Sequence, residues 1–179
     1  MSILIIIVIA IVGLIALLLI AALFTKKGYE IEREIIINKP KAEVFNYVKH
    51  ICNQDKYSKW NKTDLGMKKD YKGTDGTVGF VYAWDSQNKQ AGAGEQEIKK
   101  IADGERMESE IRFIRPFSAV AASFIATQNV SEQQTKVKWG IQSTMKYPMN
   151  IILSFMNMDK MLGKDMEVSL GDLKVILEK

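Results

Sequence analysis

The sequence predicts an α+β fold in which a curved antiparallel β-sheet wraps around a long C-terminal helix, with one transmembrane helix in front. Three observations carry this prediction. The first is an uncharged apolar run from Ile3 to Phe24. The second is a series of segments between positions 29 and 143, in most of which apolar and polar residues alternate. The third is a run of apolar residues near the C-terminus that recur every three or four positions, which is the period of a helix. We therefore expect an anchor with its basic flank in residues 1–27, and one domain in residues 28–179.

The N-terminal apolar run contains no charge and no proline. At a rise of about 1.5 Å per residue, a helix of this length crosses a hydrocarbon core of about 30 Å. A cleaved signal peptide is the alternative, but such peptides carry a basic segment before an apolar core of about 7–15 residues. No basic residue precedes Ile3, although Ala21 and Ala22 are small enough to allow cleavage. We expect an uncleaved, single-pass anchor.

The charges that follow the anchor predict its orientation. Lys26 and Lys27 come directly after the run and Arg33 follows closely, so the C-terminal domain should face the cytoplasm. The lone Cys52 fits a reducing compartment and excludes an intramolecular disulfide. The net charge of +4 is spread among acids without a basic stripe, so we expect no nucleic-acid partner.

The expected elements begin with a strand over residues 29–37. Asn38 and Pro40 then start a helix that runs to about His50, and a short helix follows from Gln54 to Trp60. Five strands come next, over residues 78–84, 94–99, 107–113, 117–128 and 137–143. Residues 117–128 are mostly small and apolar, but the other strands alternate cleanly and have one polar face. The sheet should therefore be antiparallel with one side in water.

The final segment changes period from two to about 3.6. Its apolar residues form one stripe: Ile151, Phe155, Met158, Leu162, Met166, Leu170, Leu173 and Leu177. A stripe of this kind predicts an amphipathic helix of about 30 residues. We expect this helix to lie in the concave face of the sheet.

Short motifs in a fixed order add a family resemblance. They are Trp60-Asn61, Trp84, Gly92-x-Gly94, Arg115-Pro116-Phe117, Val137-x-Trp139, the segment from Phe155 to Met161, Gly163-x-Asp165 and Leu170-x-x-Leu173-Lys174. From Tyr29 to Lys179 the chain resembles the polyketide cyclase/dehydrase-like proteins of the SRPBCC superfamily, to which START proteins also belong. The resemblance implies a helix-grip fold with a deep, mostly apolar cavity for hydrophobic ligands between sheet and helix. Many members of this group only bind, so the fold does not fix the function.

Candidate ligand contacts are the side chains assigned to the inner face of the sheet and to the facing helix. They are Tyr82, Trp84, Gln96, Ser109, Ile111, Phe113, Trp139, Ile141, Ser143, Phe155, Met158 and Leu162. The polar members are placed to hydrogen-bond a ligand headgroup. Each tryptophan is also a natural core residue whose N–H finds an ordinary partner. Glu95 and Glu97 fall on the outer face, which leaves no inward pair of carboxylates for acid–base catalysis.

The sequence offers little catalytic chemistry. His50 is the only histidine, so a His-rich metal site is excluded, and its place at the end of a helix favours capping over catalysis. Cys52 is reactive only if a neighbour such as Lys49 or His50 lowers its pKa, and a partly buried structural cysteine is the simpler interpretation. We expect no catalytic residue, no metal and no cofactor.

Three functions remain open on the sequence alone. The first is a membrane-anchored binding protein for a lipid or another hydrophobic small molecule. The second is a cyclase- or dehydratase-like enzyme, in which Tyr82, Gln96 or His50 would shuttle protons. The third is a protein-interaction module at the membrane with a vestigial cavity, whose protein partner the sequence does not identify.

Overall fold

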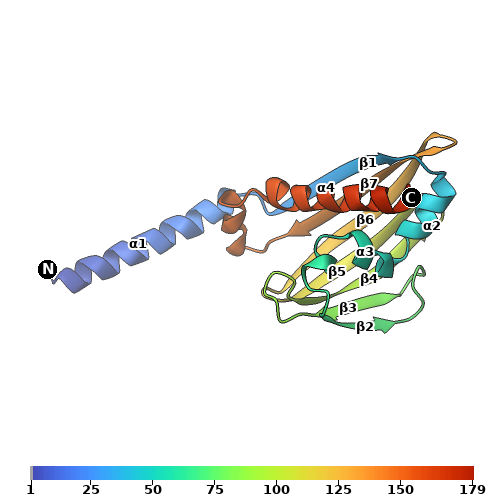
Figure 1. Cartoon of the computed structure of the whole chain (residues 1–179). Coiled ribbons are helices and arrows are strands. Elements are labelled where there is room, and N and C mark those ends of the chain that lie inside the picture. The colour runs from blue at the N-terminus through green and yellow to red at the C-terminus, as the bar shows by residue number, and fades with distance from the viewer. Residues whose placement is uncertain (1) are drawn as a thin grey trace.

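A seven-stranded antiparallel sheet curves around the C-terminal helix in the computed structural model, which describes residues 2–179 (Figure 1). The strands are β1 (Gly28–Ile37), β2 (Lys68–Lys72), β3 (Val81–Asp85), β4 (Ala93–Ala102), β5 (Arg106–Arg115), β6 (Ala119–Ser131) and β7 (Gln134–Thr144). Their order is β1-β7-β6-β5-β4-β3-β2, so the first strand closes against the last. The predicted α+β helix-grip fold is confirmed.

Four α-helices and three short 3₁₀ helices make up the other regular elements within residues 2–179. The α-helices are α1 (Ile3–Phe24), α2 (Lys41–Val48), α3 (Gln54–Tyr57) and α4 (Met158–Leu177). The 3₁₀ helices are η1 (Ile51–Asn53), η2 (Asn61–Thr63) and η3 (Met149–Ser154). Helix α4 lies along the sheet and packs on β1, whereas α2 packs on β6 and β7 (Figure 1).

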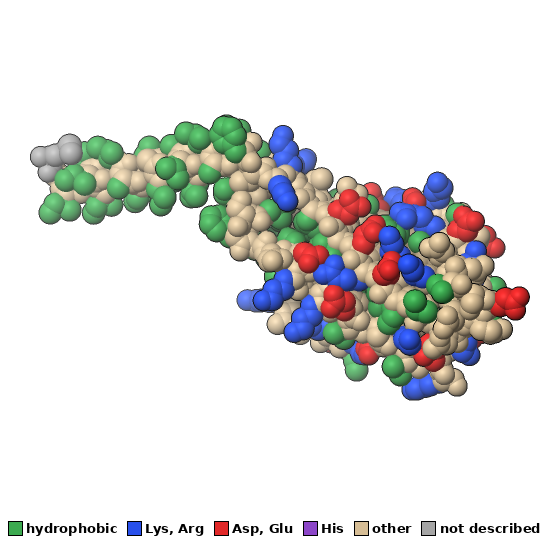
Figure 2. All heavy atoms as spheres, turned by 90° about the horizontal axis from the view of Figure 1, so that it is seen from above, with side chains coloured by type: hydrophobic (Ala, Val, Ile, Leu, Met, Phe, Trp, Pro, Cys, Tyr) green, Lys and Arg blue, Asp and Glu red, His purple; other side chains and the backbone are tan. Residues whose placement is uncertain are grey.

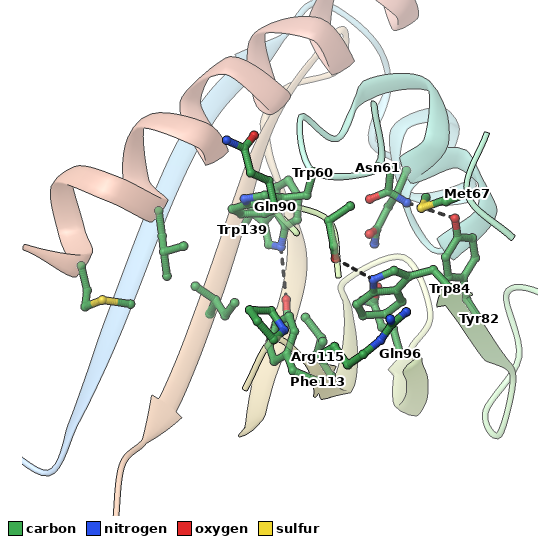
Figure 3. Close-up of a pocket in the computed structure, with 18 of the residues that line it drawn as sticks. Trp60, Asn61, Met67, Tyr82, Trp84, Gln90, Gln96, Phe113, Arg115 and Trp139 are labelled. Atoms are coloured by element: carbon green, nitrogen blue, oxygen red, sulfur yellow. Dashed lines mark hydrogen bonds between the residues drawn. The ribbon is translucent and has the colours of Figure 1, made fainter. Parts of the chain in front are cut away.

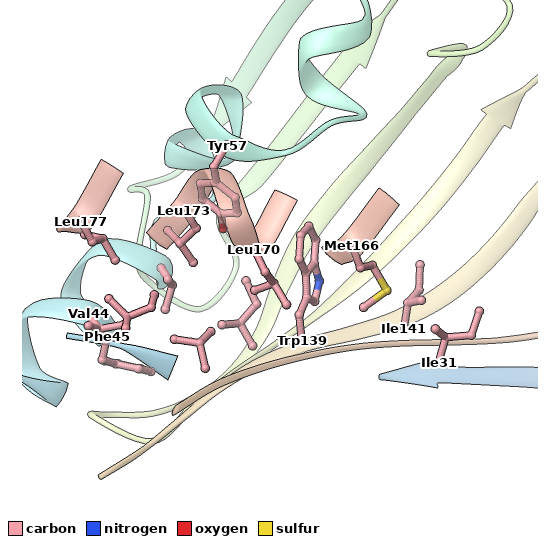
Figure 4. Packing of buried hydrophobic residues seen from close by; sticks show 14 of the residues in the cluster. Ile31, Val44, Phe45, Tyr57, Trp139, Ile141, Met166, Leu170, Leu173 and Leu177 are labelled. Atoms are coloured by element: carbon pink, nitrogen blue, oxygen red, sulfur yellow. The ribbon is translucent and has the colours of Figure 1, made fainter. Parts of the chain in front are cut away.

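The core lies between α4 and the inner face of the sheet. Met166, Leu170 and Leu173 of α4 are fully or almost fully buried and face Trp139 and its neighbours on the sheet (Figure 4). Strand alternation explains this arrangement, because successive side chains of β7 point to opposite faces. The periodicity of both elements therefore builds one apolar layer.

The C-terminal helix is shorter than the sequence predicts. Residues Met149–Ser154 form η3, and α4 begins only at Met158. The side chain of Asn157 accepts a hydrogen bond of 2.8 Å from the backbone N–H of Lys160, which is a helix N-cap. Phe155 lies before this cap and is 76% exposed, so it does not belong to the buried stripe.

Other predicted elements differ from the observed ones in exposed segments, where the spacing of apolar residues is absent or misleading. Strand β2 was not predicted, because its side chains are almost all exposed and so show no alternation of burial. Val78 and Phe117 lie outside the strands that were predicted to contain them, and both are exposed. The helix from Gln54 ends at Tyr57 rather than Trp60.

Helix α1 projects away from the domain, with its apolar side chains directed outward around its axis (Figures 1 and 2). Among its residues only Ala22 is buried. The helix is long and apolar enough to cross a membrane. Its C-terminal end is held by Asn150 of η3, whose side-chain amide donates to the carbonyl oxygen of Ala22 at 2.7 Å and to the hydroxyl of Thr25 at 2.6 Å.

Candidate ligand-binding cavity

A cavity of about 300 Å³ lies between the inner face of the sheet and the N-terminal half of α4 (Figure 3). Nine of the predicted contact residues line it: Tyr82, Trp84, Gln96, Ile111, Phe113, Trp139, Ile141, Met158 and Leu162. Strands β3, β4, β5 and β7 supply seven of them, and the first turns of α4 supply Met158 and Leu162. Their role in holding a ligand stays a prediction.

All three tryptophans of the chain line this cavity: Trp60, Trp84 and Trp139. Trp60 and Trp139 meet edge to face, with ring centroids 5.6 Å apart. The indole N–H of Trp139 donates to the hydroxyl oxygen of Ser123 at 3.2 Å, and that of Trp84 donates to the carbonyl oxygen of Ala91 at 3.0 Å. Because these two donors are paired within the protein, Trp84 and Trp139 offer mainly apolar ring surface to the cavity.

A glycine allows one of these rings to lie against the sheet. A Cβ built on Gly94 would come within 2.7 Å of the Trp84 ring and 2.6 Å of the backbone carbonyl oxygen of Arg112. Because the carbonyl belongs to a paired strand, it cannot move away as a flexible side chain could. Gly94 therefore lets the ring of Trp84 cross β4 and form part of the cavity wall.

A polar cluster borders the wall that carries Tyr82. The hydroxyl of Tyr82 donates to Oδ1 of Asp55 at 2.6 Å, the side-chain amide of Asn61 donates to the same oxygen at 2.9 Å, and Nζ of Lys69 donates to Oδ2 at 2.8 Å. Burial disfavours the charged carboxylate, but the hydrogen bonds from Lys69, Tyr82 and Asn61 outweigh it, so the pKa of Asp55 is lowered. Burial and the neighbouring Asp55 raise the pKa of Tyr82, which therefore stays protonated at neutral pH.

This cluster predicts a contribution to acid stability. Because the pKa of Asp55 in the folded state lies below its usual value of 3.8, the contribution is complete above that value and is lost as the pH falls through the folded-state pKa. Asp55→Asn should therefore reduce the loss of unfolding free energy between about pH 7 and about pH 3, measured by urea denaturation. Asp103→Asn, at a side chain that is 85% exposed, is the control and should keep the wild-type pH dependence. If the free energy of unfolding fell by the same amount between these pH values in wild type and in Asp55→Asn, the prediction would be contradicted.

Three predicted residues do not line the cavity. Ser109 is buried behind Gln96, whose side-chain amide donates to the serine oxygen at 2.9 Å. The hydroxyl of Ser143 donates to the carbonyl oxygen of Val120 at 2.6 Å, so this side chain is used within the sheet. Phe155 lies on the exposed connection before α4. Strand parity placed both serines on the inner face correctly, but it does not show how far the cavity extends along a strand.

Residues from helices and loops that were not predicted also line the cavity. Trp60 and Asn61 follow α3, while Arg115 and Pro116 stand at the end of β5. The family motifs contained all four, which was the only signal in the sequence that could have pointed to them. Tyr29 of β1 lines the cavity as well, at the strand that pairs with β7.

The only histidine, His50, and the only cysteine, Cys52, do not line the cavity. Nδ1 of His50 is 2.8 Å from the carbonyl oxygen of Asn46, so the ring caps the end of α2, and His50 does not line the cavity. Burial and the nearby Asp75 raise the pKa of the Cys52 thiol to about 12, which is opposite to the shift that a reactive thiolate needs. Within residues 2–179, no cluster of three or more His, Cys, Asp or Glu side chains is arranged to hold a metal ion.

The outer face of the sheet carries the carboxylates that the strand pattern placed there. Arg112 of β5 donates to Glu95 at 2.5 Å and to Glu97 at 2.9 Å, both on β4. The hydrogen bonds from Lys99 and Arg112 lower the pKa of Glu97. These acids are thus held in surface ion pairs on the side of the sheet away from α4.

Comparison with known proteins gives a likeness in structure without one in sequence. No protein-family model and no curated protein matches the chain. Norcoclaurine synthase from Thalictrum flavum, solved in complex with dopamine and hydroxybenzaldehyde, is similar with a TM-score of 0.59 at 11% identity, over 89% of this chain and 91% of that one. Ara h 8.0201 is similar with a TM-score of 0.56 at 12% identity, over 84% and 97% of the two chains. A Chromobacterium violaceum protein is similar with a TM-score of 0.59 at 12% identity, over the same shares. At these identities the likeness establishes the fold.

Proposed function

We propose that this protein is a membrane-anchored binding protein for a small hydrophobic molecule, which it holds in the cavity between the sheet and α4. The observation that carries the proposal is a largely apolar cavity of about 300 Å³ that is lined by all three tryptophans of the chain. Burial of apolar ligand surface, worth about 25 cal/mol per Å², would drive uptake without chemistry. The fold shared with Ara h 8.0201 and norcoclaurine synthase supports a place in the SRPBCC superfamily.

The volume of the cavity limits the size of the ligand that it can hold. The cavity has a volume of about 300 Å³. This is the low end of the range of about 300–1,000 Å³ for small-molecule sites. A molecule of one or two rings fits such a space and its flat walls, whereas a two-chain lipid would enter only in part.

The anchor gives the binding site its location. Helix α1 would keep the domain beside the bilayer, where hydrophobic molecules concentrate, and Lys26 and Lys27 favour a cytoplasmic domain. An enzymatic role is the second candidate, since norcoclaurine synthase shares the fold. The side chains favour binding, because the hydroxyl of Tyr82 is committed to Asp55, the amide of Gln96 to Ser109, and His50 lies outside the cavity.

Native mass spectrometry of the full chain, purified from its own membranes, tests this function. We expect a reproducible extra mass that leaves on denaturation and identifies the ligand. Ile111→Trp, in the cavity wall on β5, should lower ligand occupancy at least about tenfold, a change of about 1.4 kcal/mol in binding free energy. Ile114→Trp is the matched control, because it makes the same replacement on the same strand at a side chain that is 63% exposed.

Circular dichroism would confirm that both variants fold, and Leu162→Trp on α4 offers a second way to fill the cavity. A bare wild-type protein that also fails to take up added aromatic probes such as naphthalene would overturn the proposal. So would full occupancy in both folded cavity variants.

A further inference from the structure

A groove lies at the base of α1, between the start of β1 and the connection from η3 to α4. Lys26 and Tyr29 form one side of it, and Phe155, Met156 and Met158 form the other. Its location next to the anchor places it where the domain meets the proposed bilayer surface. The groove is thus the part of the domain nearest to the source of hydrophobic molecules.

This groove and the ligand cavity have two wall residues in common. Tyr29 of β1 and Met158, the first residue of α4, line both spaces. Both side chains are half-buried, as expected for a partition between two hollows. Methionine is unbranched and flexible, so Met158 can change its rotamer with little strain. Movement of these two side chains would join the groove to the cavity.

The segment beside the partition is irregular and exposed. Residues Phe155, Met156 and Asn157 link η3 to α4 without forming a helix, and Asn157 caps the first turn of α4. The side chain of Phe155 is 76% exposed, and that of Phe24 at the end of α1 is 85% exposed. Phe24 lies two residues before Lys26, which lines the same groove as Phe155. Large exposed apolar groups on one side of a domain mark an interaction site, and these two lie where a transmembrane α1 would leave the bilayer.

Charge at this place fits a lipid surface as the partner. Lys26 and Lys27 follow α1 directly, and Lys160 lies in the first turn of α4; all three are exposed. Lysines held near anionic headgroups contribute about 1 kcal/mol each. Figure 2 shows hydrophobic side chains along α1 and Lys or Arg side chains where α1 joins the domain.

The orientation of this surface is fixed by direct contacts rather than by a loose linker. Asn150 of η3 is fully buried and donates to the last turn of α1, and the backbone N–H of Met145 donates to the carbonyl oxygen of Lys27 at 2.8 Å. The groove therefore keeps a constant position relative to α1, and hence to the bilayer.

We propose that the groove at the base of α1 is a portal through which the ligand passes directly between bilayer and cavity, with Tyr29 and Met158 as its gate. The inference rests on the proposed binding function. The partner is the lipid surface around α1, and opening of the gate limits the rate of ligand exchange. A ligand that takes this route does not cross bulk water.

Stopped-flow fluorescence of the full chain in vesicles of phosphatidylcholine and phosphatidylglycerol tests the portal. The probe is 1-bromonaphthalene, which partitions into the bilayer and quenches tryptophan on contact. Because α1 contains no tryptophan and all three tryptophans line the cavity, quenching reports arrival in the cavity. Met158→Phe should slow quenching at least about tenfold, and Met158→Ala should speed it.

Leu162→Phe is the matched control. Leu162 lies one turn further along α4 and lines the cavity but not the groove. It should therefore lower the final extent of quenching while leaving the rate within about twofold of wild type. The rate should also follow the probe-to-lipid ratio rather than the total probe concentration.

The outcomes separate the portal from the proposed function. If wild type is quenched but the two Met158 variants keep its rate, or if Leu162→Phe slows quenching as much as Met158→Phe, the portal is wrong and the binding function stands. If wild type is not quenched at any probe-to-lipid ratio, both proposals fail.

Discussion

Replacing Trp139 by alanine should lower the free energy of unfolding by about 3–5 kcal/mol, the range for large aromatic residues in cores. Trp139 is 4% exposed and lies between the core and the ligand cavity. Tyr57 and Trp60 both contact it edge to face, at centroid distances of 6.1 and 5.6 Å. Truncation would open a void that joins the cavity. It would also remove the indole N–H that donates a hydrogen bond to the hydroxyl oxygen of Ser123.

Urea denaturation of the full chain in detergent micelles, followed by circular dichroism, measures this loss. Trp139→Phe keeps a ring in the same place and should cost less than Trp139→Ala. Val175→Ala is the control, because it truncates a side chain of α4 that is 58% exposed and should change stability by less than about 0.5 kcal/mol. A Trp139→Ala protein as stable as Val175→Ala would show that the void collapses without cost, contrary to the packing described above.

The fold could be predicted where one face of an element is buried and the other is not. In β7, Val137 and Trp139 are buried while Lys136 and Lys138 ion-pair with Glu34 and Glu32 of β1 on the other face, so the alternation is complete. Strand β2 has no such contrast. Its one partly buried lysine, Lys69, reaches Asp55, and a pattern of period two cannot reveal a contact of that kind.

The predicted helix was too long because apolar spacing does not distinguish burial against a sheet from burial elsewhere. Ile151 belongs to η3, and Phe155 is exposed at the base of α1, yet both continue the spacing of the α4 stripe. Asn157 is the residue that could have marked the true start of the helix, since asparagine is favoured at helix N-caps. A cap is a local hydrogen bond, and it overrides the periodicity on either side.

The candidate site was predictable on the strands but not at its ends. Tyr82, Gln96 and Phe113 follow from strand parity, because the inner face of a sheet is one set of alternate residues. Trp60 and Arg115 reach the cavity from outside the regular strand interior, where their positions depend on tertiary packing. The partition between cavity and groove has the same origin, since it needs β1 and the start of α4 to meet.

The junction between α1 and the domain should open when the side chain of Asn150 can no longer donate hydrogen bonds. Asn150→Asp places a carboxylate against the carbonyl oxygens of Ala22 and Thr25, which now accept from the side-chain amide at 2.7 and 3.5 Å. Asn150 is fully buried, so the charge would have no water to solvate it. Loss of buried hydrogen bonds with an unpaired group left behind costs about 1–3 kcal/mol, and more when the group is charged. We expect a local cost of about 3 kcal/mol.

Hydrogen exchange followed by mass spectrometry on the full chain in nanodiscs measures that opening. Peptides that cover η3 and residues 22–28 should exchange about a hundredfold faster, since each 1.4 kcal/mol is a factor of ten. Peptides from β5, β6 and β7 should keep their protection, because none of these strands contributes to the hydrogen bonds of Asn150. Thr25→Val, which removes only the hydroxyl that Asn150 contacts, should give a smaller effect. Asn129→Leu, at an exposed position of β6, should give none. Unchanged exchange in Asn150→Asp would mean that α1 and the domain are joined by a flexible link, and then the groove would have no fixed place at the bilayer.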